Sequence, residues 1–340
     1  MDVAVVTGPG RVELRNEPDP TPARDELLVE VGACGLCTME RRLFAGEKQL
    51  YPVAPGHEVA GRVIAAGEDV DGLDGVPKIG DAVTVDLLTR CGACSACRRG
   101  RSALCKSPQG GVLADGTIAM GAGLARLVSV PARQAWPTGD APVEHAAMGE
   151  PLACVAHSLR VGGFKGGDRV AIIGGGYMGR LHLALARHAG AVSAGIIDVS
   201  ADRRADGRAA GASWAETPED ASARAHECDM VFVTAGVPGA VELALTLCDD
   251  GANVALYGAF DKSLTAPVGP DLLHHHEISL IGVYSQEPQD WRLASGLIAS
   301  GVLAADLDRL VTARFGLPDV QSAFTLAATQ PVYRVLVGIG

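Results

Sequence analysis

The sequence predicts an α/β protein in which a domain of short antiparallel strands precedes a doubly wound parallel sheet. Up to about residue 131, short β-type runs are separated by Gly, Pro and Asp turns, which is typical of an antiparallel barrel or sandwich. From residue 169 the order becomes strand, glycine turn, helix and strand, which is typical of a parallel sheet covered by helices. A chain of 340 residues also exceeds the roughly 100–200 residues of one domain, so two domains are expected.

The predicted elements follow from local patterns. In the first domain, β-type runs cover residues 26–31, 58–65 and 82–87. In the second domain, strands are expected at residues 169–173, 194–198, 229–234, 253–257 and 278–283. A helix at residues 177–188 follows the first of these strands, because Met178, Leu181 and Leu185 recur at helical spacing. A helix at 288–300 and a last strand at 332–337 are surplus to the parallel sheet and are predicted to return to the first domain.

Composition excludes several function classes. Apolar residues make up 48% of the chain and the formal net charge is −11 with no basic block, so nucleic acid and anionic membrane are poor partners. The longest stretch without Asp, Glu, Lys or Arg, residues 320–333, has 14 residues, whereas a membrane span needs roughly 18. The N-terminus lacks the basic start and apolar run of a signal peptide. We therefore expect a cytoplasmic protein.

A glycine-rich turn follows the first strand of the predicted parallel sheet. Gly174, Gly176 and Gly179 form the pattern G-x-G-x-x-G between an apolar strand and a helix. The first glycine permits a tight turn, the second lets the backbone approach a pyrophosphate, and the third lets helix and strand pack closely. The helix N-terminus offers N–H groups to phosphate. The pattern therefore predicts a dinucleotide site.

The end of the next strand predicts which dinucleotide binds. Asp198 stands 24 residues after Gly174, where a carboxylate accepts hydrogen bonds from a ribose diol and repels a 2′-phosphate. This favours NAD, although Arg203 and Arg204 could tolerate a 2′-phosphate and leave NADP as the alternative. The predicted coenzyme-binding residues are Gly174, Gly176, Met178, Gly179, Asp198 and Arg203.

Nine cysteines are present, and four of them fall within fifteen residues. Clustered cysteines in a chain of cytosolic character more often hold metal than form disulfides. Four thiolates around one tetrahedral ion make a closed structural zinc site. An iron–sulfur cluster and four unrelated thiols are the alternatives. The predicted ligands of the structural zinc are Cys91, Cys94, Cys97 and Cys105.

A second set of metal-binding residue types is spread over the first 150 residues. Cys37 follows Gly-Leu, His57 and Glu58 lie in Pro-Gly-His-Glu, and Glu150 precedes Pro-Leu. Singly, each residue is more often packed or solvated than a ligand. Together they offer a thiolate, an imidazole and a carboxylate, which suits a zinc ion with a vacant fourth position. Cys34 is interpreted as a packed neighbour.

These motifs resemble the zinc-dependent medium-chain alcohol dehydrogenases over essentially the whole chain. By this resemblance, Cys37 and His57 match ligands of a catalytic zinc, and Glu58 matches a glutamate that shares or supports that site. Glu150 matches the carboxylate of the polyol (sorbitol) and threonine dehydrogenase branch. Simple alcohol dehydrogenases have a cysteine three residues later, where this chain has Ala153, and Cys154 is off by one position.

The family also implies an architecture and a reaction. A GroES-like catalytic barrel would cover residues 1–145, a Rossmann domain residues 146–284, and residues 285–340 would return to the barrel, in a homodimer or homotetramer. Zinc acts as a Lewis acid on the substrate oxygen while hydride leaves for the nicotinamide. The leading hypothesis is oxidation of a secondary alcohol of a polyol, sugar or cyclitol by NAD, with two zinc ions per chain. The alternatives are a threonine or simple-alcohol dehydrogenase, and a non-catalytic zinc- and nucleotide-binding paralogue.

One part of the chain departs from the family. Members that pass the substrate proton through a hydroxyl and a histidine have them where this chain has Met39 and Arg42, and Glu40 replaces the usual Asp. Neither methionine nor arginine can relay a proton. Thr38 could substitute only if the turn is rotated, so a carboxylate acting through a water is the favoured route.

Two other features are interpreted as non-functional. The run of His274, His275 and His276 is not expected to bind metal. Cys228 and Cys248 lie beside predicted strands, where buried inert thiols are the expected outcome.

Overall fold

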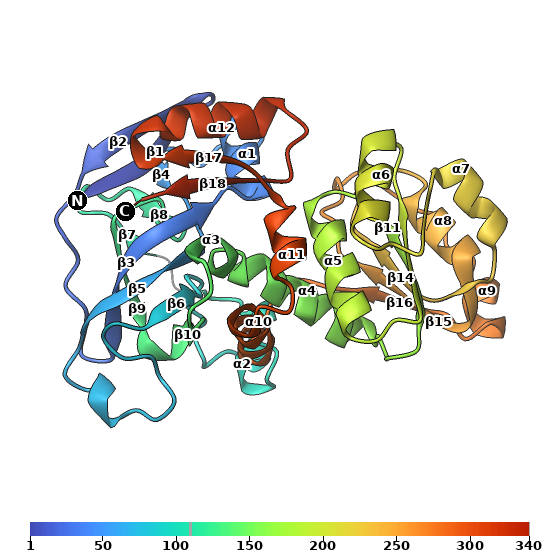
Figure 1. Cartoon of the computed structure of the whole chain (residues 1–340), viewed down its shortest axis with the longest axis horizontal. Helices are drawn as coiled ribbons and strands as arrows, with labels where there is room; N and C mark the ends of the chain where they lie inside the picture. The colour runs from blue at the N-terminus through green and yellow to red at the C-terminus, as the bar shows by residue number, and fades with distance from the viewer. Residues whose placement is uncertain (109–110, 340) are drawn as a thin grey trace. The chain divides into compact units, whose positions relative to one another are not determined.

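The computed structural model describes residues 1–108 and 111–339 and divides the chain into two compact units (Figure 1). Residues Met1–Ala153 and Gln286–Gly340 form the first unit, and Cys154–Ser285 form the second. The first unit contains mainly antiparallel sheets and the second contains one parallel sheet. The predicted α/β fold class is therefore confirmed.

Two sheets build the first unit. One is five-stranded in the order β2-β1-β4-β8-β7, and the other is seven-stranded in the order β10-β6-β5-β3-β18-β17, with β9 also paired to β3. The strands are β1 Asp2–Gly8, β2 Arg11–Asn16, β3 Glu26–Gly35, β4 Val53–Ala54, β5 Glu58–Ala66, β6 Ala82–Val85, β7 Gly111–Val112, β8 Ile118–Ala119, β9 Leu127–Pro131, β10 Ala135–Pro137, β17 Val311–Gly316 and β18 Arg334–Gly338.

The C-terminal strand β18 lies between β3 and β17 in the seven-stranded sheet. Strand β18 runs antiparallel to β3, with Val337 opposite Cys34, and parallel to β17. This pairing places Arg334, the first residue of β18, beside the end of β3, where its guanidinium donates to the Leu36 carbonyl. Arg334, near the C-terminus, and Leu36, near the N-terminus, therefore lie side by side at the end of β3.

Helices pack around these sheets. They are α1 Thr38–Phe44, α2 Ser95–Arg98, α3 Val143–Ala146, α4 Gly149–Gly162, α10 Pro288–Ser300, α11 Ala304–Asp308 and α12 Val320–Thr329, with 3-10 turns at Val70–Gly72, Ser102–Leu104, Ala132–Gln134 and Leu317–Asp319. Helix α4 continues into the second unit. Helix α12 lies along β17 and β18 (Figure 1) and buries Phe324 in the core of this unit, where its ring meets that of Phe44.

The C-terminal region contains more structure than the sequence predicts. Only the helix at 288–300 and the last strand were expected there, and the prediction missed β17, α11 and α12. The strand expected at 82–87 ends at Val85, so Asp86 and Leu87 leave the sheet. Strand β17 is short and only half-buried at alternate positions, which gives it a weak signal in the sequence.

The second unit is a six-stranded parallel sheet in the order β13-β12-β11-β14-β15-β16. Its strands are β11 Arg169–Ile173, β12 Ser193–Ile197, β13 Trp214–Glu216, β14 Cys228–Val233, β15 Cys248–Leu256 and β16 Ser279–Gly282. Its helices are α5 Tyr177–His188, α6 Ala201–Ala209, α7 Pro218–Ala221, α8 Ala240–Leu247 and α9 Pro270–His275, with a 3-10 turn at Ser222–Arg224. The strand order reverses between β11 and β14, and a ligand crevice is expected at the carboxyl ends of these strands.

A buried histidine joins two helices of the second unit. His182 of α5 has no exposed surface, its Nδ1 lies 2.7 Å from the Met178 carbonyl oxygen, and its Nε2 lies 2.9 Å from Ser158 Oγ. The rings of Phe232 and Tyr257 pack against it. Burial lowers the pKa of His182 from 6.5 to about 4. The imidazole is therefore neutral at neutral pH and links α4 to α5.

This histidine predicts acid sensitivity of the second unit. Between pH 6.5 and 4, His182 binds a proton in the unfolded chain but stays neutral in the folded chain. The free energy of unfolding therefore falls as the pH falls. At about 1.4 kcal/mol per pKa unit, the loss reaches about 3 kcal/mol near pH 4. In urea melts at several pH values, His182→Asn should flatten this dependence, while the exposed His188→Asn should leave it unchanged. Equal pH dependence in His182→Asn and wild type would contradict the assignment.

Candidate metal and coenzyme sites

Cys37 lies at the turn between β3 and α1. It is the N-cap residue of α1, and Glu40 is the third residue of that helix. The Glu40 carboxylate accepts a hydrogen bond from the Cys37 N–H at 3.0 Å, as the glutamate of a capping box does. The start of this helix therefore holds the thiol and the Glu40 carboxylate in a fixed relation.

His57 follows a glycine that no other residue can replace without strain. Gly56 has φ +108, and a Cβ on it would lie 2.6 Å from the Leu124 nitrogen. Glu40 Oε1 lies 2.9 Å from His57 Nδ1 and accepts the Gly56 N–H at 3.2 Å. Burial opposes protonation of His57, but the charge of Glu40 and hydrogen bonds to Cys37 and Glu40 raise its pKa well above the usual value. With Nδ1 engaged by Glu40, Nε2 is the nitrogen available to a metal ion.

Glu58, the first residue of β5, forms a buried ion pair with the last strand of the chain. Its Oε1 lies 3.0 Å from Arg334 Nη2, and the side chains are 1% and 5% exposed. Gly35 makes room for the carboxylate, since a Cβ there would lie 2.3 Å from Glu58 Oε2. Burial raises the pKa of Glu58 to about 7, while Arg334 opposes the rise and the charge of Glu150 adds to it.

The structure brings Cys37, His57 and Glu58 within reach of a single ion. One possible ligand atom from each lies within 4.8 Å of the other two. Glu58 Oε2 is buried and accepts no hydrogen bond from the described residues, so it can turn to a cation. A thiolate, an imidazole and a carboxylate suit zinc with an open position. Glu150 is buried and its charge acts on Glu58, but among the described residues its carboxylate falls outside this group.

The four clustered cysteines form a closed sulfur site. Their Sγ atoms all lie within 4.8 Å of one another, with separations of 3.5 Å for Cys94–Cys97, 3.5 Å for Cys91–Cys105 and 4.0 Å for Cys91–Cys97. Four sulfurs bound tetrahedrally to zinc at about 2.3 Å would be separated by about 3.8 Å. The Cys91 and Cys94 N–H groups donate to sulfurs of the cluster, which stabilises thiolates. The lobe therefore fits a structural zinc ion.

The side chains at the start of α1 offer few routes for a proton. Thr38 is exposed as the first residue of the helix, and Met39 is half-buried against the core of the first unit. Arg42 lies 3.5 Å from Glu47 in an ion pair. The hydroxyl and the histidine of the usual relay are therefore replaced by side chains that cannot pass a proton.

In the second unit, the glycine turn lies between β11 and α5, next to the point where the strand order reverses. Gly174 has φ +107, and a Cβ on Gly179 would lie 1.8 Å from the Gly174 oxygen. The space above Gly176 is open, since the atom nearest to a Cβ there would be Arg203 Nη1 at 3.9 Å. This geometry suits a tight turn, a closely packed helix and an approaching phosphate.

Asp198, which directly follows β12, is buried against the glycine turn. Its Oδ2 accepts the Gly175 N–H at 2.8 Å, and its Oδ1 accepts the Ser200 N–H at 2.8 Å. Arg203 Nη1 lies 3.6 Å from Oδ2. The carboxylate is thus fixed at the carboxyl edge of the sheet, where an adenosine ribose would lie.

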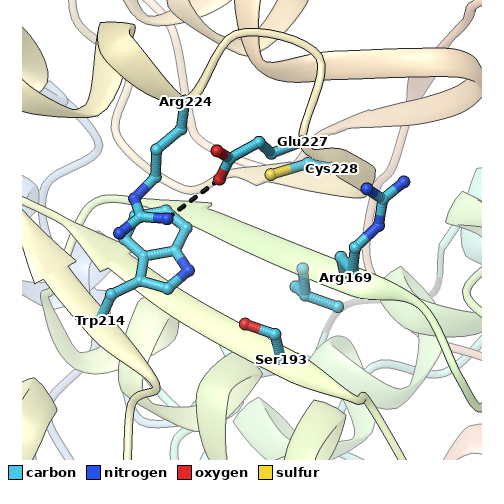
Figure 2. A pocket seen from close by; sticks show the side chains of 7 residues that line it. Arg169, Ser193, Trp214, Arg224, Glu227 and Cys228 are labelled. Carbon is cyan, nitrogen blue, oxygen red and sulfur yellow. Dashed lines mark hydrogen bonds and ion pairs between the residues drawn. The ribbon is translucent and has the colours of Figure 1, made fainter.

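A cavity of about 230 Å³ lies at the opposite, amino-terminal edge of this sheet. Figure 2 shows Arg224 over the ring of Trp214, at 4.5 Å, with an ion pair to Glu227. Arg224 also pairs with Glu216, and Arg169 pairs with two aspartates. Both guanidinium groups in the cavity wall are therefore matched by carboxylates of this unit, and the cavity does not belong to the coenzyme site.

The structure also shows the surroundings of the residues that were interpreted as non-functional. Within the described part of the chain, His274, His275 and His276 are not among the groups close enough to share one ion. Cys228 and Cys248 are buried, and burial raises the pKa of each thiol to about 12. Such thiols are poor nucleophiles.

Sequence reasoning missed the partners that orient the candidate ligands. The role of Glu40 could have been found, because a glutamate at the third position of a helix often completes a capping box. Arg334 gives no local signal, since it meets Glu58 only through the pairing of β18 with β3. None of the helices in residues 1–108 and 111–339 combines the length and the apolar character that crossing a bilayer requires.

Comparisons with known proteins agree with this geometry. Two protein-family models match the chain: "Alcohol dehydrogenase GroES-like domain" at residues 23–140 and "Zinc-binding dehydrogenase" at residues 178–300. The chain is 26% identical to D-arabinitol dehydrogenase 1 of Uromyces fabae, covering 92% of this chain and 90% of that protein. It is 29% identical to L-threonine 3-dehydrogenase of Thermococcus kodakarensis, covering 90% and 89%. A zinc-binding dehydrogenase structure from Sinorhizobium meliloti, bound to NADP, is 31% identical with a TM-score of 0.88, covering 99% and 98%.

Proposed function

This chain belongs to the zinc-dependent medium-chain alcohol dehydrogenase family, and from that premise we propose that it oxidises a secondary alcohol of a polyol, sugar or cyclitol with NAD. As a member, it is an alcohol dehydrogenase that uses zinc and a nicotinamide coenzyme. The observation that carries the proposal is the convergence of Cys37, His57 and Glu58, with Glu150 nearby, in place of the second cysteine of simple alcohol dehydrogenases. The likeness to an arabinitol dehydrogenase supports the polyol class.

The residues divide the work of the reaction between them. Cys37, His57 and a carboxylate, Glu58 or Glu150, would hold the ion, and Glu40 would fix the imidazole through Nδ1. When bound, zinc supplies Lewis-acid polarisation of the substrate oxygen and the nicotinamide accepts the hydride. The proton would pass from the substrate hydroxyl to a carboxylate oxygen of Glu58 or Glu150 through one water. The four-cysteine lobe would hold a second zinc ion with no catalytic position.

A substrate panel tests this function. Zinc-loaded protein and NAD would be mixed with pentitols, hexitols, cyclitols, L-threonine and simple secondary alcohols, and NADH absorbance followed. We expect the highest kcat/KM for a polyol, sugar or cyclitol. A clear preference for L-threonine, supported by the threonine dehydrogenase relatives, would replace the proposed substrate class. Absence of NADH with every alcohol would favour the non-catalytic paralogue.

Coenzyme choice is predicted to rest on Asp198. Its carboxylate would bind the ribose diol of NAD and repel a 2′-phosphate, so kcat/KM should be at least tenfold higher with NAD than with NADP. In Asp198→Ala this ratio should narrow, because NAD loses hydrogen bonds while NADP loses a repulsion. Asp202→Ala, at the exposed first turn of α6, is the matched control. Equal kcat/KM for both coenzymes in the wild type would refute NAD preference, which the NADP-bound relative makes a real alternative.

We also propose, from composition and family, a homodimer or homotetramer that works in the cytoplasm. Sedimentation equilibrium of the zinc-loaded protein would measure its oligomeric state.

A further inference from the structure

Asp86 and Arg90 form a second, largely buried ion pair in the first unit. The segment leaves the sheet after β6, and Arg90 Nη1 lies 3.4 and 3.3 Å from the two carboxylate oxygens of Asp86. Their side chains are only 13% and 14% exposed. The Leu88 N–H donates to Asp86 Oδ1 at 3.0 Å, and the Arg90 guanidinium donates to the Leu88 carbonyl. The loop therefore folds around the pair.

A glutamine fixes the main chain of this loop to the sheet. The Asp86 N–H donates to the Gln134 carbonyl at 2.8 Å, and Gln134 Nε2 donates to the Asp86 carbonyl at 2.6 Å. Thr89 Oγ donates to Gln134 Oε1 at 3.2 Å. Because these bonds hold the Asp86 backbone and the Thr89 side chain, the Asp86 carboxylate keeps a defined position. Such a preformed polar group suits substrate recognition.

The packing of β6 against α4 brings this pair close to Glu150. Gly149 lies directly against Thr84, since a Cβ on Gly149 would lie 2.3 Å from Thr84 Oγ. Asp86 stands two residues after Thr84, and Glu150 follows Gly149. Burial raises the pKa of Asp86 to about 6; Arg90 opposes the rise and the charge of Glu150 contributes to it. Glu150 thus acts electrostatically on both Glu58 and Asp86.

The charge of the pair indicates which substrate group it can bind. A carboxylate accepts hydrogen bonds and a guanidinium donates them, so an alcohol hydroxyl can donate to Asp86 and accept from Arg90 at the same time. An ammonium group can only donate, and it would meet the positive charge of Arg90. A neutral hydroxyl is therefore the better match.

We propose that Asp86, held by Arg90, binds a second hydroxyl of the substrate beside the metal site and so selects polyols over amino alcohols and simple alcohols. This inference rests on the proposed oxidation of an alcohol and narrows its substrate class. Asp86 determines specificity, whereas the chemical step belongs to the residues around Cys37.

The test compares substrates with and without the second hydroxyl. Steady-state kcat and KM would be measured for zinc-loaded wild type, Asp86→Asn and Asp86→Ala with D-arabinitol, ribitol, isopropanol and L-threonine. For the better pentitol, Asp86→Ala should lower kcat/KM at least tenfold, mainly by raising KM, because a hydrogen bond to a charged group is lost. For isopropanol the change should stay within about twofold. Asp86→Asn keeps the shape of the side chain but not its charge, so its kcat/KM for the pentitol should lie between those of the wild type and Asp86→Ala.

Controls separate this proposal from a structural role and from the proposed function. Asp25→Asn removes a carboxylate of the same unit that pairs with Arg133 at 3.5 Å and is 57% exposed. This variant should change kcat/KM for neither the pentitol nor isopropanol. A parallel loss for pentitol and isopropanol in both Asp86 variants would assign Asp86 a structural role and overturn the inference alone. A wild type that prefers L-threonine would also overturn it. If wild type reduces NAD with none of these alcohols, the proposed function itself fails.

Discussion

Replacing Cys37 with alanine is expected to lower kcat by more than about 1000-fold while the protein stays folded. Cys37 supplies the thiolate of the three-residue group, and Lewis-acid stabilisation worth several kcal/mol is lost with the ion. Elemental analysis should find two zinc ions per wild-type chain and one in Cys37→Ala. Circular dichroism and thermal melting should match the wild type, because the surrounding strands are held by their own core.

Cys97→Ala is the matched comparison, since it also removes one sulfur and one ion. Its lobe closes on four sulfurs with no open position, so metal binding there is coupled to local folding. We expect a lower melting temperature and faster proteolysis near residues 91–105. Loss of turnover in Cys37→Ala with both zinc ions still bound would contradict the assignment of Cys37 to the catalytic ion.

The second large effect concerns the substrate proton. Thr38→Val should change kcat by no more than a few-fold, because this exposed hydroxyl is not needed if a carboxylate accepts the proton. Glu58→Gln should lower kcat at least ~100-fold, the low end of general acid–base effects. Stopped-flow kinetics with a pH indicator would follow proton release beside hydride transfer in both variants.

The ion pair of Glu58 with Arg334 calls for its own controls. Glu58→Gln also removes the partner of a buried arginine, so zinc content and melting temperature must be measured with the rate. Glu150→Gln is the second carboxylate variant. If kcat falls in this variant and not in Glu58→Gln, Glu150 is the carboxylate that accepts the proton. If Thr38→Val is the slower variant while zinc content is unchanged in all three, a hydroxyl relay replaces the carboxylate route.

Local signals predicted the second unit well. Strand β11 and helix α5 of that unit lie where the sequence placed them, and so does α10 of the first unit, because each combines a clear apolar pattern with a turn or a proline at its start. The glycine turn adds a requirement that only glycine meets at residues 174 and 179. Where a short segment carries its own pattern and its own boundary signal, sequence alone locates the element.

The supporting contacts of the candidate metal site depend on long-range pairing instead. Arg334 reaches Glu58 because β18 adds to the sheet beside β3, and Asp86 approaches Glu150 because α4 packs on β6. No residue spacing within a single segment predicts the contact of Arg334 with Glu58 or the proximity of Asp86 to Glu150. The candidate ligands could be proposed from residue types, whereas their orientation by Glu40 and Arg334 required the fold.

The central claim is zinc-dependent hydride transfer from a secondary carbinol to NAD, and isotope transfer tests it most directly. A pentitol deuterated at its secondary carbinol carbons would be incubated with NAD and either zinc-loaded or chelator-treated protein. The account predicts deuterium at the reactive carbon of NADH, recovered by mass spectrometry, with zinc-loaded protein and none after zinc removal. NADH formed without deuterium, or at the same rate after zinc removal, would contradict it.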